Sequence, residues 1–274
     1  MTRILLPTDF SDTAQKAAHF AMDVYGTDDV RYTLVNSFTL QTYPDTLLPD
    51  LTLLPARDSR SGLRQAERRL RKRADRVYVA KVSAYVALPE ALNDIAASKG
   101  GDLIVMGAQG KSSTLLIGRN SSTVIKRARL PVITVPAHWE PGPIKHILLP
   151  MDGEPFEAET LRPLIDLVHR CGAEVLVAHV RTNAVSFTKG MDHTAIDAAL
   201  KGIKHRYITV HGASVVDTVN DMASGGRIQL VAMIHRKRGF LDGLFPVSYT
   251  HLRAHETVLD LVCRLLLEKK NNII

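Results

Sequence analysis

The sequence predicts two consecutive doubly wound α/β domains, each built on a parallel sheet. The apolar stretch ILLPTDF, residues 4–10, returns as ILLPMDG, residues 147–153, at an offset of 143 positions. In both halves short β-rich runs alternate with segments of helical periodicity, and helices between strands imply right-handed parallel crossovers. A chain of 274 residues suits two domains of ordinary size. We therefore expect domains at residues 1–140 and 141–245.

The first half is expected to contain five strands alternating with four helices. Ser11 or Asp12 can cap the first helix, whose apolar face runs from Ala14 to Tyr25 before Gly26 ends it. Pro89 suits the first turn of a later helix. Residues 38–61, with three prolines, are expected to be irregular, and a basic helix follows them. The expected strands are 3–7, 32–37, 77–85, 102–106 and 130–135, and the later helices are 89–98 and 121–129.

The second half is expected to repeat this order with less material. Its expected strands are 144–150, 174–180, 207–210 and 228–234, and its expected helices are 157–171 and 214–224. The matched fourth strands, LIVM from Leu103 and LVAM from Leu230, are only 127 positions apart. About 16 residues are therefore missing, most simply from the counterpart of residues 38–61. Residues 138–143, with two prolines and a glycine, are the expected linker.

Residues 246–274 do not follow the repeat. Where the first half has SSTVIKRARLPVITVP, the chain reads PVSYTHLRAHETVLDLVCRLLLEKKNNII, without a matching fifth strand. The stretch SYTHLRAHET resembles translated adapter or vector sequence, so we expect a non-native tail that forms at most an accidental amphipathic helix at 258–266. The second sheet would then be incomplete. The strand at 130–135 would expose an apolar edge for packing between the domains or for a homodimer.

Composition and charge exclude several classes of protein. The chain is 45% hydrophobic and 23% charged, has two cysteines, and shows neither a signal-like start nor a membrane-spanning run, so we expect a cytoplasmic protein without a membrane partner. The net charge of +7 is mostly local, because residues 57–76 hold nine Arg or Lys against three acids. No aromatic residues interleave with these charges, which favours a solvated helix face over sequence-specific nucleic-acid binding. An acidic partner or an anionic surface remains an alternative.

Two loops of the first half carry the residues suited to a ligand. In an open parallel sheet, ligands bind beyond the carboxyl ends of the strands, where the strand order reverses. Glycines let the backbone approach a ligand, free amides at a helix start favour phosphate, and a carboxylate can bond a base or ribose. The Walker A and dinucleotide glycine patterns are both missing. The candidate residues after strands one and four are Pro7, Thr8, Asp9, Gly107, Gly110, Lys111, Gly118, Asn120, Ser121 and Ser122.

These residues carry a family resemblance. Both domains open with an ILLPTDFSD-like strand, and the first closes with MGAQGKSS and GRNSSTVIKRARLPVITVP. With these motifs the chain resembles a tandem universal stress protein over residues 1 to about 245. The resemblance implies five-stranded sheets of order 3-2-1-4-5, of the adenine nucleotide alpha hydrolase-like type, and ATP or a related adenine nucleotide as ligand. It implies Asp9 at the base or ribose, Gly107 and Gly110 near the ribose and phosphates, and Gly118, Ser121 and Ser122 at the phosphates.

The glycine loop departs from the family pattern. That pattern has nine residues between its second and third glycines, whereas seven separate Gly110 from Gly118, and Arg119 follows where Ser or Thr is expected. Two interpretations stay open. Either an altered loop still binds ATP, with Lys111 and Arg119 supplying charge, or the residues form only a strand-end turn and a cap at Asn120 or Ser121.

The second half serves as a control for the first. It keeps an aspartate at Asp152, but Ile234 stands in place of Gly107 and Lys237 in place of Gly110, so we expect no nucleotide there. The shared Asp9 and Asp152 can serve the turn itself. Scattered histidines and the lack of an identifiable base favour a non-enzymatic stress-response or signalling protein. The alternatives are an interaction scaffold that has lost nucleotide binding and a slow ATP hydrolase using Asp9.

Overall fold

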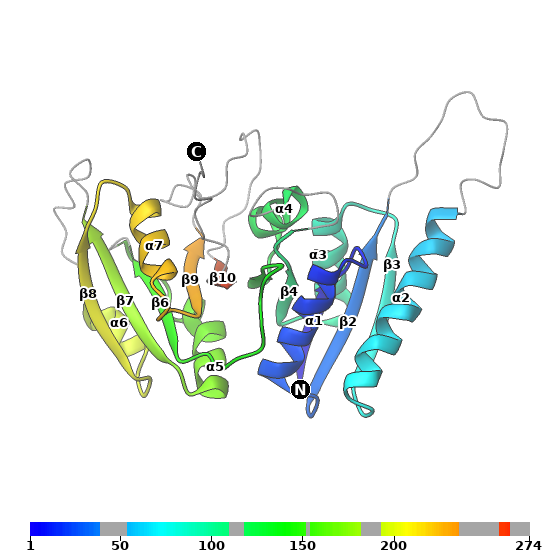
Figure 1. The fold of residues 1–274 in the computed structure, drawn as a ribbon, viewed down its shortest axis with the longest axis horizontal. Coiled ribbons are helices and arrows are strands. Elements are labelled where there is room, and N and C mark those ends of the chain that lie inside the picture. The colour runs from blue at the N-terminus through cyan, green and yellow to red at the C-terminus, as the bar shows by residue number, and fades with distance from the viewer. Residues whose placement is uncertain (39–53, 110–117, 152–153, 182–192, 236–257, 264–274) are drawn as a thin grey trace, which may run out of the picture. The chain divides into compact units, whose positions relative to one another are not determined.

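Parallel strands form the centre of both halves of the chain. The computed structural model describes residues 1–38, 54–109, 118–151, 154–181, 193–235 and 258–263 (Figure 1). The chain divides into two compact units, Met1–Ala137 and His138–Ile274. Each unit is described by itself below.

The first unit is a doubly wound parallel sheet of five strands. Their order is β3-β2-β1-β4-β5, and every neighbouring pair is parallel. This is the order that the family resemblance implied. Helix α1 packs beside α2, and α3 packs beside α4. The elements are β1 Thr2–Pro7, α1 Asp12–Tyr25, β2 Val30–Ser37, α2 Leu54–Arg73, β3 Tyr78–Ala84, α3 Leu88–Lys99, β4 Leu103–Gly107, α4 Arg119–Arg127 and β5 Val132–Val135.

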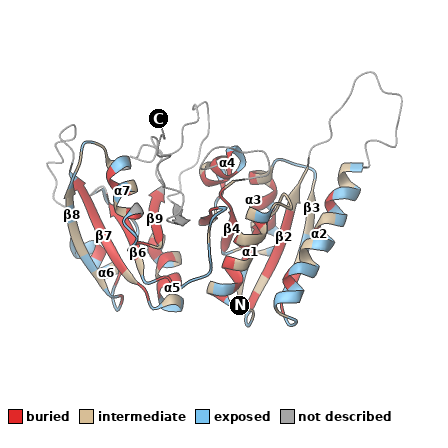
Figure 2. Ribbon diagram, viewed as in Figure 1, coloured by how far each residue is buried: buried red, intermediate tan, exposed pale blue. Residues whose placement is uncertain are grey.

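The core of this unit lies between the central strands and the alanine-rich face of α1. All of β4 and β5 is buried, as continuous apolar runs require in a sheet covered on both faces. Helix α1 begins where the Ser11 hydroxyl accepts a hydrogen bond from the Ala14 amide at 3.2 Å. Figure 2 shows that burial concentrates on the strands, whereas the outer sides of the helices are exposed.

Helix α2 begins earlier than the sequence analysis expected. Residues 54–61 were assigned to an irregular excursion because of Pro55, but α2 starts at Leu54 and places Pro55 in its first turn. Proline is well tolerated there, because the first amides of a helix have no intrahelical partner. The proline therefore marks the start of the helix rather than a break.

The second unit has the same central strand order. Parallel strands run β9-β6-β7-β8, which corresponds to β4-β1-β2-β3 in the first unit. A short helix, α6, was not predicted, and Pro163 separates the single predicted helix 157–171 into η2 and α5. The elements are β6 His146–Met151, η2 Ala158–Leu161, α5 Arg162–Cys171, β7 Glu174–Arg181, α6 His193–Ala199, β8 His205–His211, α7 Val215–Ser224 and β9 Leu230–His235.

The strand register shows which residues of the two units are equivalent. Ile4 lies opposite Tyr32 on one side and Leu103 on the other, and Ile147 lies likewise between Val175 and Leu230. The pairing therefore confirms the offsets of 143 and 127 that the repeated motifs gave. In the next strands Tyr32 pairs with Val79, and Val175 pairs with His205. The length difference thus arises between the second and third strands of each unit.

The shortening falls within the connection that holds the predicted excursion and the helix after it. Residues 38–77 join β2 to β3, and residues 182–204 join β7 to β8. Within these segments α2 has 20 residues and the described helix α6 has seven. The two segments differ by about 17 residues, and residues 39–53 and 182–192 within them lie outside the described part of the chain.

The tail contains a strand, contrary to the expectation of no strand and at most an accidental helix. Residues Val258–Cys263 form β10, which pairs antiparallel with β9. A short, mostly apolar run such as VLDLVC can form either helix or strand, and only tertiary pairing decides between them. The second unit therefore has four parallel strands with one antiparallel strand beside β9.

Candidate functional site

The loop after β1 is fixed by its own side chains. The Asp9 carboxylate accepts a hydrogen bond from the Ser11 amide at 3.1 Å, and the Thr8 hydroxyl accepts one from the Phe10 amide at 3.0 Å. These bonds let Phe10 adopt a left-handed backbone conformation, with φ of 63°. Asp9 therefore has a structural role in the turn, as the sequence analysis allowed.

The end of β2 is joined to this loop. The Asn36 side-chain amide donates to the Thr8 carbonyl oxygen at 2.7 Å, and the Thr8 amide donates to the Val35 carbonyl at 2.8 Å. Because β1 and β2 are parallel neighbours, their carboxyl ends present these polar groups at the same edge of the sheet.

The end of β4 is packed tightly against α1. A Cβ atom on Gly107 would lie 2.9 Å from the Thr13 side chain and 3.2 Å from the Ala14 nitrogen. The buried Ser121 hydroxyl donates to the Gly107 carbonyl at 2.9 Å, which holds the first turn of α4 against β4. Gly118 caps α4 without a side-chain hydrogen bond. Gly107 is thus required by packing, independently of any ligand.

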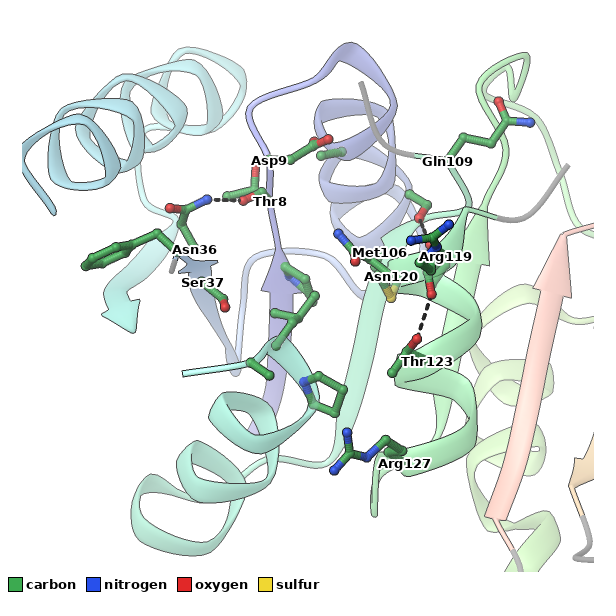
Figure 3. A pocket seen from close by; sticks show the side chains of 18 residues that line it. Thr8, Asp9, Asn36, Ser37, Met106, Gln109, Arg119, Asn120, Thr123 and Arg127 are labelled. Atoms are coloured by element: carbon green, nitrogen blue, oxygen red, sulfur yellow. Dashed lines mark hydrogen bonds between the residues drawn. The ribbon is translucent and has the colours of Figure 1, made fainter. Parts of the chain in front are cut away.

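A cavity of about 450 Å³ opens between these strand ends. In Figure 3, Thr8, Asp9 and Asn36 lie on one side of it, and Arg119, Asn120 and Thr123 of α4 lie on the other. Its described lining consists of Pro7, Thr8, Asp9, Ala14, Asn36, Ser37, Phe38, Ala87, Leu88, Pro89, Met106, Gly107, Gln109, Arg119, Asn120, Ser121, Thr123 and Arg127. The position is the switch point, since β1 and β4 are neighbours whose connecting helices leave in opposite directions.

The charges around the cavity are unevenly distributed. Asp9 is the one acidic side chain among the described lining residues, whereas Arg119 and Arg127 supply two guanidinium groups. Arg127 forms an ion pair with Glu90 of α3, and Asn93 donates to the Arg127 carbonyl at 3.0 Å, so the far end of α4 is held against α3. The first turns of α3 and α4 both contribute to the lining, and helix N-termini favour anions.

The structure brings together six of the ten residues that the sequence analysis selected. Pro7, Thr8, Asp9, Gly107, Asn120 and Ser121 line the cavity. Gly118 and Ser122 do not line it; Gly118 is the cap residue of α4 and Ser122 is buried in its first turn. Gly110 and Lys111 lie outside the described residues. In the second unit Asp152 and Lys237 also lie outside them.

Sequence reasoning missed two groups of lining residues. Asn36, Ser37 and Phe38 follow β2, and a polar residue at the end of a strand next to β1 was a usable signal. Ala87, Leu88 and Pro89 begin α3, while Thr123 and Arg127 lie further along α4. Their approach to β1 depends on how the helices pack, for which the sequence has no local signal.

The described residues show neither a metal cluster nor a membrane helix. In the described parts of the chain, no three His, Cys, Asp or Glu side chains gather closely enough to bind a metal ion. Among the helices of the described residues, none combines the length and the apolar character needed to cross a bilayer.

Comparison with known proteins identifies the first unit. The model of the universal stress protein family matches residues 1–136. Residues 1–136 are a universal stress protein domain. No curated protein matches the chain.

Two solved universal stress proteins share the fold over most of this chain. One from Archaeoglobus fulgidus DSM 4304 is 16% identical, with a TM-score of 0.63 over 95% of this chain and 97% of that one. A putative universal stress protein from Pseudomonas aeruginosa UCBPP-PA14 is 14% identical, with a TM-score of 0.56 over 97% of this chain and 95% of that one. A universal stress protein in complex with cAMP matches 49% of this chain and 96% of its own, at 22% identity and a TM-score of 0.39.

Proposed function

We propose that this chain is a universal stress protein that binds an adenine nucleotide in the cavity of its first unit. The observation that carries the proposal is the cavity itself. Its volume of about 450 Å³ suits a nucleotide, and it lies at the switch point of the sheet. Apolar side chains of Phe38, Leu88 and Met106 line it together with carboxylate, amide and guanidinium groups. This combination suits a flat base, a ribose and an anionic phosphate.

We assign the ligand-binding roles by chemistry. The Asp9 carboxylate can accept hydrogen bonds from a ribose or base, and the amides of Asn36 and Asn120 can donate or accept. Arg119 stands at the start of α4, where its guanidinium and the helix N-terminus both favour phosphate. Arg119 thus supplies charge where the family pattern has Ser or Thr.

Equilibrium binding of labelled ATP to the full chain tests this proposal. Asp9→Asn keeps the oxygen that accepts from Ser11 but removes the charge, and Arg119→Ala removes the guanidinium. Each is expected to weaken binding about tenfold or more, the range for a lost hydrogen bond to a charged group. The matched controls are Asp12→Asn and Arg129→Ala, whose side chains do not line the cavity. No measurable binding of ATP to the unmodified chain would sink the proposal and leave the scaffold alternative.

We further propose that the role is non-enzymatic and that the second unit is a degenerate copy without a nucleotide. Asp9 is the one carboxylate among the described lining residues, and the turn already uses it. In the second unit the buried Ile234 stands at the position of Gly107. If the unmodified chain releases phosphate from ATP and the Asp9→Asn variant does not, the non-enzymatic role is overturned. A cytoplasmic location stays part of the same proposal.

A further inference from the structure

Basic side chains form a stripe along the outer side of α2. Ser59, Leu63 and Leu70 are buried beneath this helix, which packs on β2 and β3. On the other side Arg57, Arg60, Arg64, Arg68 and Lys72 are all exposed. They recur every three or four residues and therefore share one side of the helix. We call these five residues the basic stripe, and Figure 2 shows much of α2 coloured as exposed.

Three neighbouring basic residues form ion pairs within the unit, whereas the stripe residues form none with the described residues. Glu67 pairs with both Arg71 and Lys81, and Arg73 pairs with Asp23 at 2.5 Å. Among the described residues, none lies within ion-pair distance of a stripe side chain. The stripe therefore presents five positive charges to solvent.

The stripe is not explained by folding. Arg60, Arg64, Arg68 and Lys72 succeed one another at i, i+4 spacing, and like charges at this spacing destabilise a helix. The matched helix of the second unit, α6, reads HTAIDAA and contains no Arg or Lys. The described helix at this place in the second unit thus carries no such stripe.

We propose that the basic stripe binds the phosphate backbone of double-stranded nucleic acid without reading base sequence. Four of its five residues are arginines, whose planar guanidinium can bind phosphate through two hydrogen bonds. At 1.5 Å per residue, successive charges are about 4.5 to 6 Å apart and the stripe is about 22 Å long. That length corresponds to about six base pairs of a duplex at 3.4 Å each.

The surroundings of the stripe favour a duplex over other anionic partners. Single-stranded nucleic acid is usually bound with aromatic side chains that stack on the bases, and the stripe contains none. A helix that lies on a membrane inserts an apolar face, whereas the apolar side of α2 is buried on its own sheet. A rigid row of guanidinium groups alone suits a regular row of phosphates.

Fluorescence anisotropy with the full chain and labelled DNA duplexes of about 20 base pairs tests the proposal. Two unrelated sequences are expected to bind equally. Affinity should fall with salt between about 50 and 200 mM, with a log–log slope of about −4.5 for five phosphate contacts. Arg60→Glu, Arg64→Glu and Arg68→Glu together should weaken binding at least tenfold and reduce the slope by about three. The corresponding triple Lys variant keeps the charge and should bind about threefold more weakly.

A matched control separates the stripe from net charge. The control variant carries Arg181→Glu, Lys201→Glu and Arg227→Glu at exposed positions of the second unit. It changes the net charge by the same amount and should leave binding within about twofold. Thermal melting followed by circular dichroism shows whether each variant is folded. Equal loss in both triple variants would overturn the proposal, as would no duplex binding at low salt. Tighter binding to polyglutamate or to phosphatidylserine vesicles than to the duplex would also overturn it, by assigning the stripe to an acidic protein or a membrane.

Discussion

The two units share strand order and register but differ where the first strand ends. In the first unit α1 begins at Asp12, and its first turn meets Gly107. In the second unit the residues matched to Thr13 and Ala14 are Phe156 and Glu157, which precede the helical segment that begins at Ala158. Without a helical turn at that point, the buried Ile234 can stand where the first unit has glycine.

This difference changes what a glycine found in one copy means. The presence of Gly107 in the first half alone supported a ligand in the sequence analysis. The structure gives Gly107 a second reason, because α1 leaves no room for a Cβ atom. The nucleotide proposal therefore depends on the cavity and its polar lining rather than on the glycine.

The largest expected effect comes from Ile234→Ala, which tests whether the isoleucine at the position of Gly107 belongs to the core of the second unit. Ile234 is 6% exposed in β9, so truncation should lower the free energy of unfolding of the second unit by about 2 to 5 kcal/mol. Urea unfolding followed separately in each unit measures the loss. An effect below about 0.5 kcal/mol would show that Ile234 is not part of the core.

Gly107→Val tests whether packing against α1 requires a glycine at this position of the first unit. The new side chain would press on Thr13 and on the backbone at Ala14, which should destabilise the first unit by about 1 to 3 kcal/mol. Gly142→Val is the control, because nothing lies within 4 Å of a Cβ atom there. If ATP binding is lost in Gly107→Val while the unfolding free energy is unchanged, Gly107 acts on the ligand and not on packing.

Most of the fold could be predicted because both halves repeat strong local signals. The ILLP strands, the Ser11 cap and the matched offsets identified the strands and helices, whereas the order of the strands was implied by the family resemblance. The predicted start of α2 was wrong because a proline such as Pro55 can either break a helix or begin one. The strand at Val258–Cys263 was not predicted, because the periodicity of so short an apolar run does not distinguish a strand from a helix.

The candidate site was less predictable, because its walls come from elements far apart in the sequence. Asp9 and Asn120 could be selected from motifs beside β1 and α4. Leu88 and Arg127 line the same cavity only because α3 and α4 pack together, which no motif encodes. Gly118 was selected for a ligand but acts as a helix cap.

A smaller effect is expected where the loop of the first unit meets α2. A Cβ atom on Gly62 would lie 2.4 Å from the Phe10 ring, so Gly62→Ala gains helix propensity only if that ring moves. In a Phe10→Ala background the same substitution should stabilise the first unit by about 0.5 to 1 kcal/mol. In the unmodified chain it should be neutral or destabilising. Equal effects in both backgrounds, measured by a double-mutant cycle, would show that Phe10 and Gly62 do not interact.

The smallest expected effect is a pH dependence confined to the second unit. There His205 stands at the position of Val79, with its two ring nitrogens 2.8 Å from the Ile203 carbonyl oxygen and 2.9 Å from an Asp197 carboxylate oxygen. Only the doubly protonated ring can donate to both acceptors. The hydrogen bond to Asp197 raises the pKa of His205 despite its partial burial, and the Ile203 carbonyl adds to the rise.

The sign of this dependence follows from the raised pKa. The charged ring stabilises the folded unit fully below the unfolded pKa of about 6.5, and the contribution is lost as pH rises through the folded pKa. The melting temperature of the second unit should therefore fall between about pH 6 and pH 8.5 more steeply than in His205→Gln. His169→Gln, at an exposed position of α5, should keep the steeper profile. Because Val79 cannot titrate, the first unit should show no such difference, and parallel profiles for all three proteins would exclude His205 as the cause.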